Sequence, residues 1–178
     1  MSMKNDQPPL QHIYDLSDLT QAGAEVRVTA APENLPGLAN WAGVDSVKRF
    51  AATVTLRRLT QSRFQFDAKL TADVVQSCVV TLEPVPSRIS RRVTRELHLA
   101  PRVPREESGE LTLSAGDDDV PETILSLDYD LAAPLLEEFA LAIDPYPRKE
   151  GVAFTPPADA EGAEASPFAV LKALKDRD

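Results

Sequence analysis

Seven arginines lie close together in the middle of the chain, and arginine is a side chain well suited to bind phosphate. The guanidinium group donates paired hydrogen bonds to phosphate oxygens. If neighbouring strands presented these residues on one face of a sheet, the face would neutralise the phosphates of RNA. Few aromatic residues lie among them, so recognition of phosphate or shape is favoured over stacking on unpaired bases. The candidate RNA-binding residues are Arg57, Arg58, Arg63, Arg88, Arg91, Arg92 and Arg95.

The charge of the whole chain hides an uneven distribution. The formal net charge is −9, which by itself argues against a nucleic-acid partner. Residues 47–105, however, hold twelve Lys or Arg against four Asp or Glu, a net charge of +8, and the remainder of the chain is net −17. Such a chain can direct a polyanion to one face. A second interpretation stays open, in which the arginines pair with acids across the fold.

Other residue types could do covalent or acid–base chemistry. Cys78 could act as a nucleophile with His98 as its base, and Glu83 could serve as a general acid or base. A single cysteine inside a strand is more typical of a core position, and a glutamate before proline is more typical of a turn. No glycine-rich phosphate loop or catalytic triad motif is present. We therefore predict a protein that is not an enzyme and has no catalytic residues.

The same residue counts argue against a metal or a cofactor. One cysteine cannot form an internal disulfide, and with two histidines it makes a zinc site improbable. No motif suggests a small-molecule substrate. We expect no metal, no cofactor and no such substrate.

Alternating polar and apolar residues predict that the arginines lie on two strands within residues 63–99. The first strand alternates most clearly, with apolar residues at Phe64, Phe66, Ala68 and Leu70. In the second run, Ile89, Val93 and Leu97 fit a strand and also the spacing of a helix. Pro84 and Pro86 favour the strand, because residues before proline avoid the helical conformation.

Further strands and helices are predicted around this centre. Strands are expected over 24–30 and from Val47 onward, with a short edge strand over 110–114. A short helix over 33–41 places Trp41 in the core and ends at Gly43. The clearest helix begins at Asp130, which is placed to cap it, and ends before Pro145; its apolar stripe is Leu131, Leu135, Phe139 and Ile143.

Together these elements predict an α+β fold. The sheet is mostly antiparallel, or forms a partly open barrel, with a few packed helices. Residues 1–147 are expected to form one domain, residues 148–165 a flexible linker, and residues 166–178 a short C-terminal helix. The helix is too short to be stable alone. Its apolar stripe would therefore dock on its own domain or a partner, through Phe168, Leu171 and Leu174.

The chain carries no sign of a membrane segment. No apolar run approaches the ~20 residues needed to cross a bilayer. The first ten residues lack the apolar stretch of a signal peptide. We therefore expect a cytoplasmic protein without a membrane partner.

Three segments, in this order, resemble the YceD-like family of large ribosomal RNA subunit accumulation proteins. They are CVVTLEPV at 78–85, DLAAPLLEEFALAIDPYP at 130–147 and SPFAVLKALK at 166–175, and the likeness extends from Phe64 to the C-terminus. The family motif is carried by Cys78, Leu82, Glu83 and Pro84. Some relatives have additional cysteines that resemble a zinc site. Here Thr81 occupies one of those places and residues 144–151 contain no cysteine, so the chain resembles the metal-free form.

The resemblance implies a non-enzymatic role in the maturation or accumulation of large-subunit ribosomal RNA and in ribosome assembly, in a bacterial cytoplasm or a derived organelle. Two partners remain open at this point. The basic strands favour direct contact with ribosomal RNA. The segment 106–164, which has sixteen acids against Arg148 and Lys149, favours an adaptor or chaperone for a basic large-subunit ribosomal protein.

Overall fold

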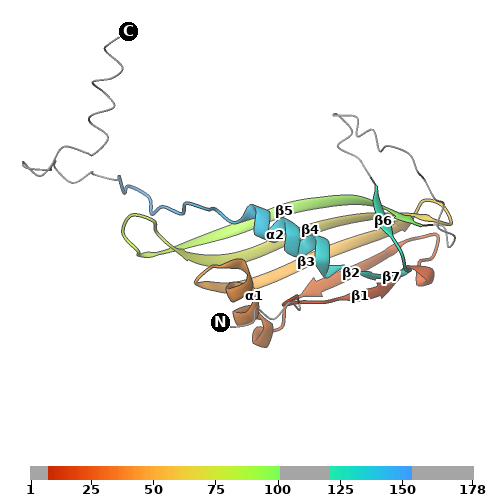
Figure 1. Cartoon of the computed structure of the whole chain (residues 1–178), viewed down its shortest axis with the longest axis horizontal. Coiled ribbons are helices and arrows are strands. Elements are labelled where there is room, and N and C mark those ends of the chain that lie inside the picture. Colours follow the sequence, from red (N-terminus) through yellow and green to blue (C-terminus); the bar gives the residue numbers. More distant parts are fainter. Residues whose placement is uncertain (1–7, 101–120, 154–178) are drawn as a thin grey trace, which may run out of the picture.

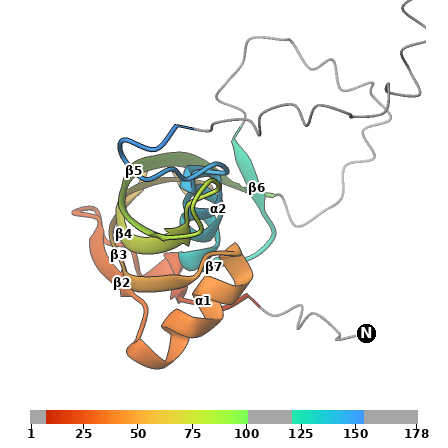
Figure 2. The ribbon, with the colours of Figure 1, turned by 90° about the vertical axis from the view of Figure 1, so that its left-hand side faces the viewer.

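A five-stranded sheet curves around one helix in the computed structural model, which describes residues 8–100 and 121–153 (Figures 1 and 2). The strand order is β2-β3-β4-β5-β6, and neighbouring strands run antiparallel except for the parallel pair β5 and β6. The strands are β2 (Ala24–Thr29), β3 (Ser46–Arg58), β4 (Arg63–Ser77), β5 (Pro84–Leu99) and β6 (Glu122–Ile124).

Strict alternation along β4 divides the sheet into an inner and an outer face. From Phe64 to Gln76 every even-numbered side chain of β4 is buried, and every odd-numbered one is half-buried or exposed. The register of β4 with β5 continues without a shift from Arg63 opposite His98 to Ser77 opposite Pro84. Because side chains alternate along each strand, burying the inner face directs every second residue outward.

Helix α2 (Ala132–Ala142) covers the inner face of the sheet (Figure 2). Asp130 accepts a hydrogen bond from the Ala132 N–H at 3.0 Å, which satisfies an amide at the start of the helix. The buried side of α2 includes Leu135 and Phe139, and the Phe139 ring meets Phe50 of β3 edge to face at 5.4 Å between centroids. Both rings are fully buried in the core.

Smaller elements close the remaining sides. A two-stranded antiparallel sheet joins β1 (Ile13–Asp15) to β7 (Asp128–Asp130), and the 3₁₀ turn η1 (Leu16–Asp18) follows β1. A second 3₁₀ turn, η2 (Pro32–Asn34), leads into helix α1 (Leu35–Ala42), which packs beside β3. The helix ends at Gly43, whose φ of +69° is left-handed and therefore favours glycine.

The predicted α+β class is confirmed. The predicted strands over 63–99 are confirmed as β4 and β5, and the helical alternative for the second run is wrong. The sheet is open among the described residues, so they do not form a closed barrel. The helix after Asp130 is confirmed as α2, with Leu131, Leu135 and Phe139 fully buried.

The prediction that Trp41 anchors the core is wrong, because its side chain is 46% exposed. Leu38 and Ala39 are the buried residues of α1, and Leu35 and Ala42 pack against the core beside them. At about 100° per residue, Trp41 lies about 110° around the helix from the centre of that buried side. The apolar stripe therefore continues to Ala42 and leaves the tryptophan on the flank.

Several predicted segments lie outside the described residues. They are the edge strand over 110–114, the linker beyond residue 153, and the terminal helix with Phe168, Leu171 and Leu174. The division into a domain, a linker and a helix therefore stays a prediction. Among the described residues, no helix is both long and apolar enough to cross a membrane.

The Phe50–Phe139 contact predicts a large loss of stability when the helix ring is removed. Phe139→Ala should lower the free energy of unfolding by about 3–5 kcal/mol, because it leaves a cavity between α2 and β3. Urea denaturation measures the change. Leu141→Ala on the same helix is the control: Leu141 is 82% exposed, and its loss should change stability by less than about 0.5 kcal/mol. Equal effects of the two substitutions would contradict this packing.

Candidate nucleic-acid interface

The sheet separates the seven candidate arginines onto two faces. Along β5, Ile89, Val93 and Leu97 are buried, so the odd-numbered positions face inward and the even-numbered positions face outward. Along the second half of β3 the buried positions are even-numbered. The outer face carries Arg57, Arg63, Arg88 and Arg92, and the inner face carries Arg58, Arg91 and Arg95. The seven residues therefore do not form one continuous basic surface.

Arg91 and Arg95 pair with acids from the second half of the chain. Arg91 Nε lies 3.7 Å from Glu138 Oε1. Arg95 bridges two acids, with Nη1 at 3.2 Å from Glu122 Oε2 and Nη2 against Glu137. Burial alone would lower the pKa of Arg95, but hydrogen bonds to Glu137 and Glu122 raise it above its usual value. These ion pairs attach α2 and β6 to β5.

Arg58 stabilises the turn after β1. Its Nη2 donates hydrogen bonds to the carbonyl oxygens of Leu16 at 2.9 Å and Ser17 at 3.2 Å. Its guanidinium carbon lies 5.6 Å from the centroid of the Phe64 ring, within the range of a cation–π contact. Arg58 is thus engaged within the fold.

The outer face carries a row of unpaired cations across four strands. Register aligns Arg27 of β2 with Thr53, Thr53 with Lys69 of β4, and Lys69 with Arg92 of β5. All three cations are exposed. None of them forms an ion pair with a carboxylate of residues 8–100 or 121–153. Their charges are therefore available to a ligand.

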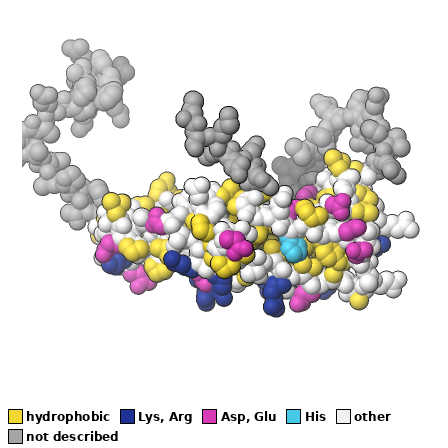
Figure 3. All heavy atoms as spheres, turned by 90° about the horizontal axis from the view of Figure 1, so that it is seen from below, with side chains coloured by type: hydrophobic (Ala, Val, Ile, Leu, Met, Phe, Trp, Pro, Cys, Tyr) yellow, Lys and Arg dark blue, Asp and Glu magenta, His cyan; other side chains and the backbone are white. Residues whose placement is uncertain are grey.

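A second basic row lies four residues further along β4. Asp73 sits between two arginines, with Oδ2 at 3.0 Å from Arg49 Nε and Oδ1 at 2.8 Å from Arg88 Nε. The hydrogen bond from Arg88 is the main cause that lowers the pKa of Asp73, with Arg49 adding to it. We call the two rows together the basic platform: Arg27, Lys69, Arg92, Arg49, Arg88 and the single acid Asp73, net +4. In Figure 3, Lys and Arg side chains project along one long margin of the molecule.

The opposite end of the outer face is not basic. Arg63 pairs with Glu96, and Glu96 also accepts a hydrogen bond from the His98 ring at 2.7 Å. Glu25 and Asp67 lie on the same face in the row between Arg57 and the row of Arg27 and Lys69. The outer face therefore changes from basic to mixed charge along its length.

Sequence reasoning missed three members of the platform: Arg27, Arg49 and Lys69. They are far from the arginine-rich run in the chain and meet it only through strand register. The alternation along β3 and β4 placed Arg49 and Lys69 among the outward positions, but it could not align one strand with the next. The sequence also indicated that Arg27 points outward, because it alternates with the apolar residues Val26 and Val28.

The family motif forms the turn of the β4–β5 hairpin. Cys78 N–H donates to the Glu83 carbonyl at 2.8 Å, and Leu82 N–H donates to the Cys78 carbonyl at 2.9 Å. The chain after α2 lies against this turn: Val79 N–H donates to the Pro147 carbonyl at 2.9 Å, and Lys149 Nζ contacts both Glu83 carboxylate oxygens at 3.0–3.1 Å. Glu83 therefore binds Lys149 rather than turn amides.

Cys78 is buried at the base of this turn and serves as a hydrogen-bond acceptor. The Thr81 side chain, followed by the backbone N–H groups of Lys149, Thr81 and Val80, lowers the pKa of the thiol to about 6. No group of three or more His, Cys, Asp or Glu side chains among the described residues could hold a metal ion. With one thiol and no cysteine in the facing segment, these residues do not fit a zinc site.

The proposed pairing of Cys78 with His98 does not occur. Cys78 follows the last residue of β4, and His98 lies opposite its first residue, Arg63. At about 3.4 Å per residue the two side chains are roughly 45–50 Å apart. His98 instead contacts Glu96. No nucleophile and base therefore come together there.

Apolar side chains are exposed at the hairpin turn. Leu82 is 77% exposed and has a φ of +62°, a conformation that costs a non-glycine residue energy. Val79 and Tyr146 are exposed beside it, from the two segments that the hydrogen bonds join. A strained leucine held in solvent is typical of a contact surface.

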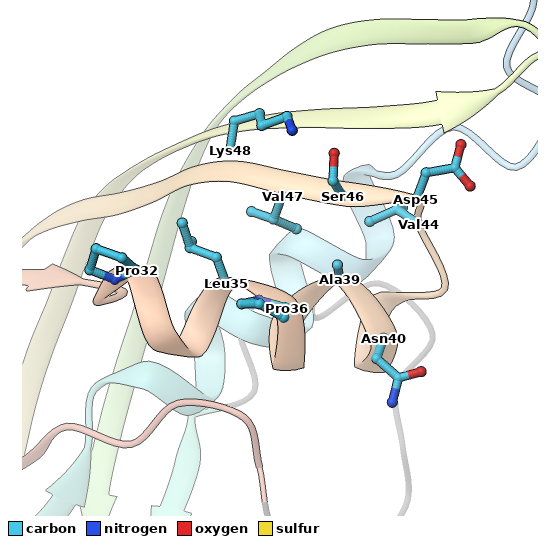
Figure 4. A pocket seen from close by; sticks show the side chains of 10 residues that line it. All are labelled: Pro32, Leu35, Pro36, Ala39, Asn40, Val44, Asp45, Ser46, Val47 and Lys48. Carbon is cyan, nitrogen blue, oxygen red and sulfur yellow. The ribbon is translucent and has the colours of Figure 1, made fainter.

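A shallow groove of about 550 Å³ lies between α1 and the start of β3 (Figure 4). Its walls are mainly apolar, including Leu35, Ala39 and Val47, and its charged side chains are Asp45 and Lys48. These groups do not combine a nucleophile with a base. The groove gives no support to a catalytic site.

These features define a class of protein: a curved sheet wrapped on one helix, with an extended charged face and no catalytic arrangement among the described residues. Residues 66–175 match the family model described as "Large ribosomal RNA subunit accumulation protein YceD". The match covers more than half of the chain, so the chain belongs to the YceD family. The family description concerns RNA accumulation rather than a reaction, and it connects the chain with ribosome biogenesis. Neither the curated proteins nor the solved structures gave a match.

The two faces predict different consequences for two arginines of the same strand. Arg95→Ala should lower the free energy of unfolding by about 1–2 kcal/mol, because it leaves Glu122 and Glu137 without their shared partner. Arg92→Ala should change stability by less than about 0.5 kcal/mol. Chemical denaturation of both variants measures the difference. Equal stability of the two variants would contradict the assignment of Arg95 to the fold.

Proposed function

We infer that this protein is a non-enzymatic factor in the maturation or accumulation of large-subunit ribosomal RNA, and that it contacts the RNA through the basic platform. The proposal places the protein in a bacterial cytoplasm with ribosomal RNA as its partner. Family membership supports the process, and the platform supports direct contact.

The observation that carries RNA contact is the row Arg27, Lys69 and Arg92. These cations lie in one row on the convex outer face of the curved sheet (Figure 2), are exposed and have no carboxylate partner among the described residues. Placing phosphates against them releases the counterions of the RNA, which favours binding and makes it dependent on salt. Arg49 and Arg88 extend the same surface.

The platform revises the set of RNA-binding residues. Arg88 and Arg92 remain in it, and Arg27, Arg49 and Lys69 are added. Arg57 and Arg63 lie on the same face at its mixed-charge end, where they would contact only an RNA long enough to span the sheet. Arg58, Arg91 and Arg95 act in the fold through the contacts described above.

A second candidate function is an adaptor or chaperone for a basic large-subunit ribosomal protein. The exposed apolar group at the hairpin turn, Val79, Leu82 and Tyr146, favours it. Asp45, Asp144 and Glu150 lie on the segments around that turn, which suits a partner that is both basic and apolar. The two functions use different surfaces of the molecule and can be tested separately.

RNA contact predicts that reversing two platform charges will weaken binding. Lys69→Glu/Arg92→Glu should reduce affinity for large-subunit ribosomal RNA by at least about tenfold and flatten its salt dependence, since phosphate contacts are lost. Fluorescence anisotropy at two salt concentrations measures both. The control, Arg148→Glu/Lys149→Glu, makes the same change of net charge on the segment that lies against the β4–β5 turn, away from the platform. RNA affinity that falls equally in both variants, or that is absent from the wild type, would reject the platform.

The adaptor function predicts a different result at the hairpin. Leu82→Gly removes the exposed side chain and relieves the left-handed strain, so the free energy of unfolding should rise by about 1 kcal/mol. Capture of purified large-subunit ribosomal proteins should be lost while RNA affinity is unchanged. Leu125→Gly, at another exposed leucine, is the control for capture. Unchanged capture by Leu82→Gly would reject this function.

A further inference from the structure

The basic platform is built as two lines of cations with an uncharged strip between them. The first line is Arg27, Lys69 and Arg92, and the second is Arg49 and Arg88 on either side of Asp73. Four residues of β4 separate the lines, which corresponds to about 14 Å. The two lines run across the strands, side by side.

The strip between the lines consists of small side chains. Register places Thr29, Ala51, Thr71 and Ser90 in one row across β2 to β5. Ser90 and Thr29 are exposed, so their hydroxyl groups face solvent on this strip. The side chains of this row are all shorter than the lysine and arginine side chains of the two cation lines.

The outer face lacks the side chains that bind unpaired bases. From β2 to β5, none of the described residues on this face is Phe, Tyr or Trp. Proteins that bind single strands stack bases on such rings. The face therefore offers charge and hydroxyl groups and does not offer stacking.

We propose that the platform binds double-stranded RNA across its minor groove, with one phosphate backbone on each line of cations. The proposal rests on the RNA contact inferred above and names the form of RNA. The minor groove of A-form RNA is wide and shallow and displays 2′-hydroxyl groups between its two backbones. The small row at Thr29, Ala51, Thr71 and Ser90 allows that groove to approach the sheet, and its hydroxyls lie where the 2′-hydroxyls would be.

The test blocks the strip without changing any charge. Ser90→Phe places a ring between the two lines, and Thr29→Phe repeats the change on another strand. Thr94→Phe is the matched control, because Thr94 lies on the same strand and face, four residues away, opposite Asp67 rather than in the strip. Thermal unfolding of each variant establishes that it is folded before binding is compared.

The probes are an RNA duplex of about twenty base pairs, each of its single strands, and the DNA duplex of the same sequence. The wild type should bind the RNA duplex at least about tenfold more tightly than a single strand, and more tightly than the DNA duplex. Ser90→Phe and Thr29→Phe should each weaken RNA-duplex binding by about tenfold and leave single-strand binding unchanged or stronger. Thr94→Phe should stay within about twofold of the wild type.

The outcomes separate this inference from the proposed function. Equal affinity for the RNA duplex and the single strand, or duplex binding that is unaffected by both strip variants, would overturn the duplex assignment while leaving RNA contact in place. Equal affinity for the RNA and DNA duplexes would overturn the minor-groove contact. No binding to any RNA would overturn the proposed function together with this inference.

Discussion

Burial of the inner face of β3, β4 and β5 against α2 is the constraint on which the rest of the structure depends. The Phe50–Phe139 contact and the fully buried side chains around it determine which alternate side chains of each strand face the core. Since a shift of one residue would expose the apolar row, the register between strands is held firmly. The positions of Lys69 and Arg92 on the outer face follow from that burial. The basic platform is thus positioned by apolar packing on the opposite side of the same strands.

The charged side chains of the sheet have two separate roles: some form ion pairs within the fold, and others remain unpaired on the outer face. Acids of α2 and β6 pair with Arg91 and Arg95 on the inner face, and Glu122 and Glu137 neutralise Arg95, which would otherwise be a half-buried cation beside an apolar core. Asp73 holds Arg49 and Arg88 in place without cancelling both charges. The cations of the first platform row are left without such partners among the described residues. The net charge of −9 therefore says little about the local potential over this face.

Strand and helix positions could be predicted from the sequence because they depend on local periodicity. The alternation at 64–70 and the stripe from Leu131 to Phe139 each reflect one buried side of one element. Two features could not be predicted this way. Alignment of Arg27 with Lys69 depends on the register of three strands, and the pairing of Arg91 and Arg95 with acids of α2 depends on where the helix lies. Arg91 and Arg95 nevertheless occupy odd-numbered positions, as do the apolar residues Ile89 and Val93. The alternation along this strand therefore indicated that both arginines face inward.

The pairing of β1 with β7 has a consequence for how the chain reaches this fold. His12 N–H donates to Asp130 Oδ1 across 118 positions of sequence, whereas β3, β4 and β5 are joined by short turns. The hairpins involve local contacts and can form early, but closing so long a loop is entropically slow. During synthesis, β1 has no strand to pair with until residue 130 has left the ribosome. The fold can therefore be completed only after the segment that begins α2 has emerged from the ribosome.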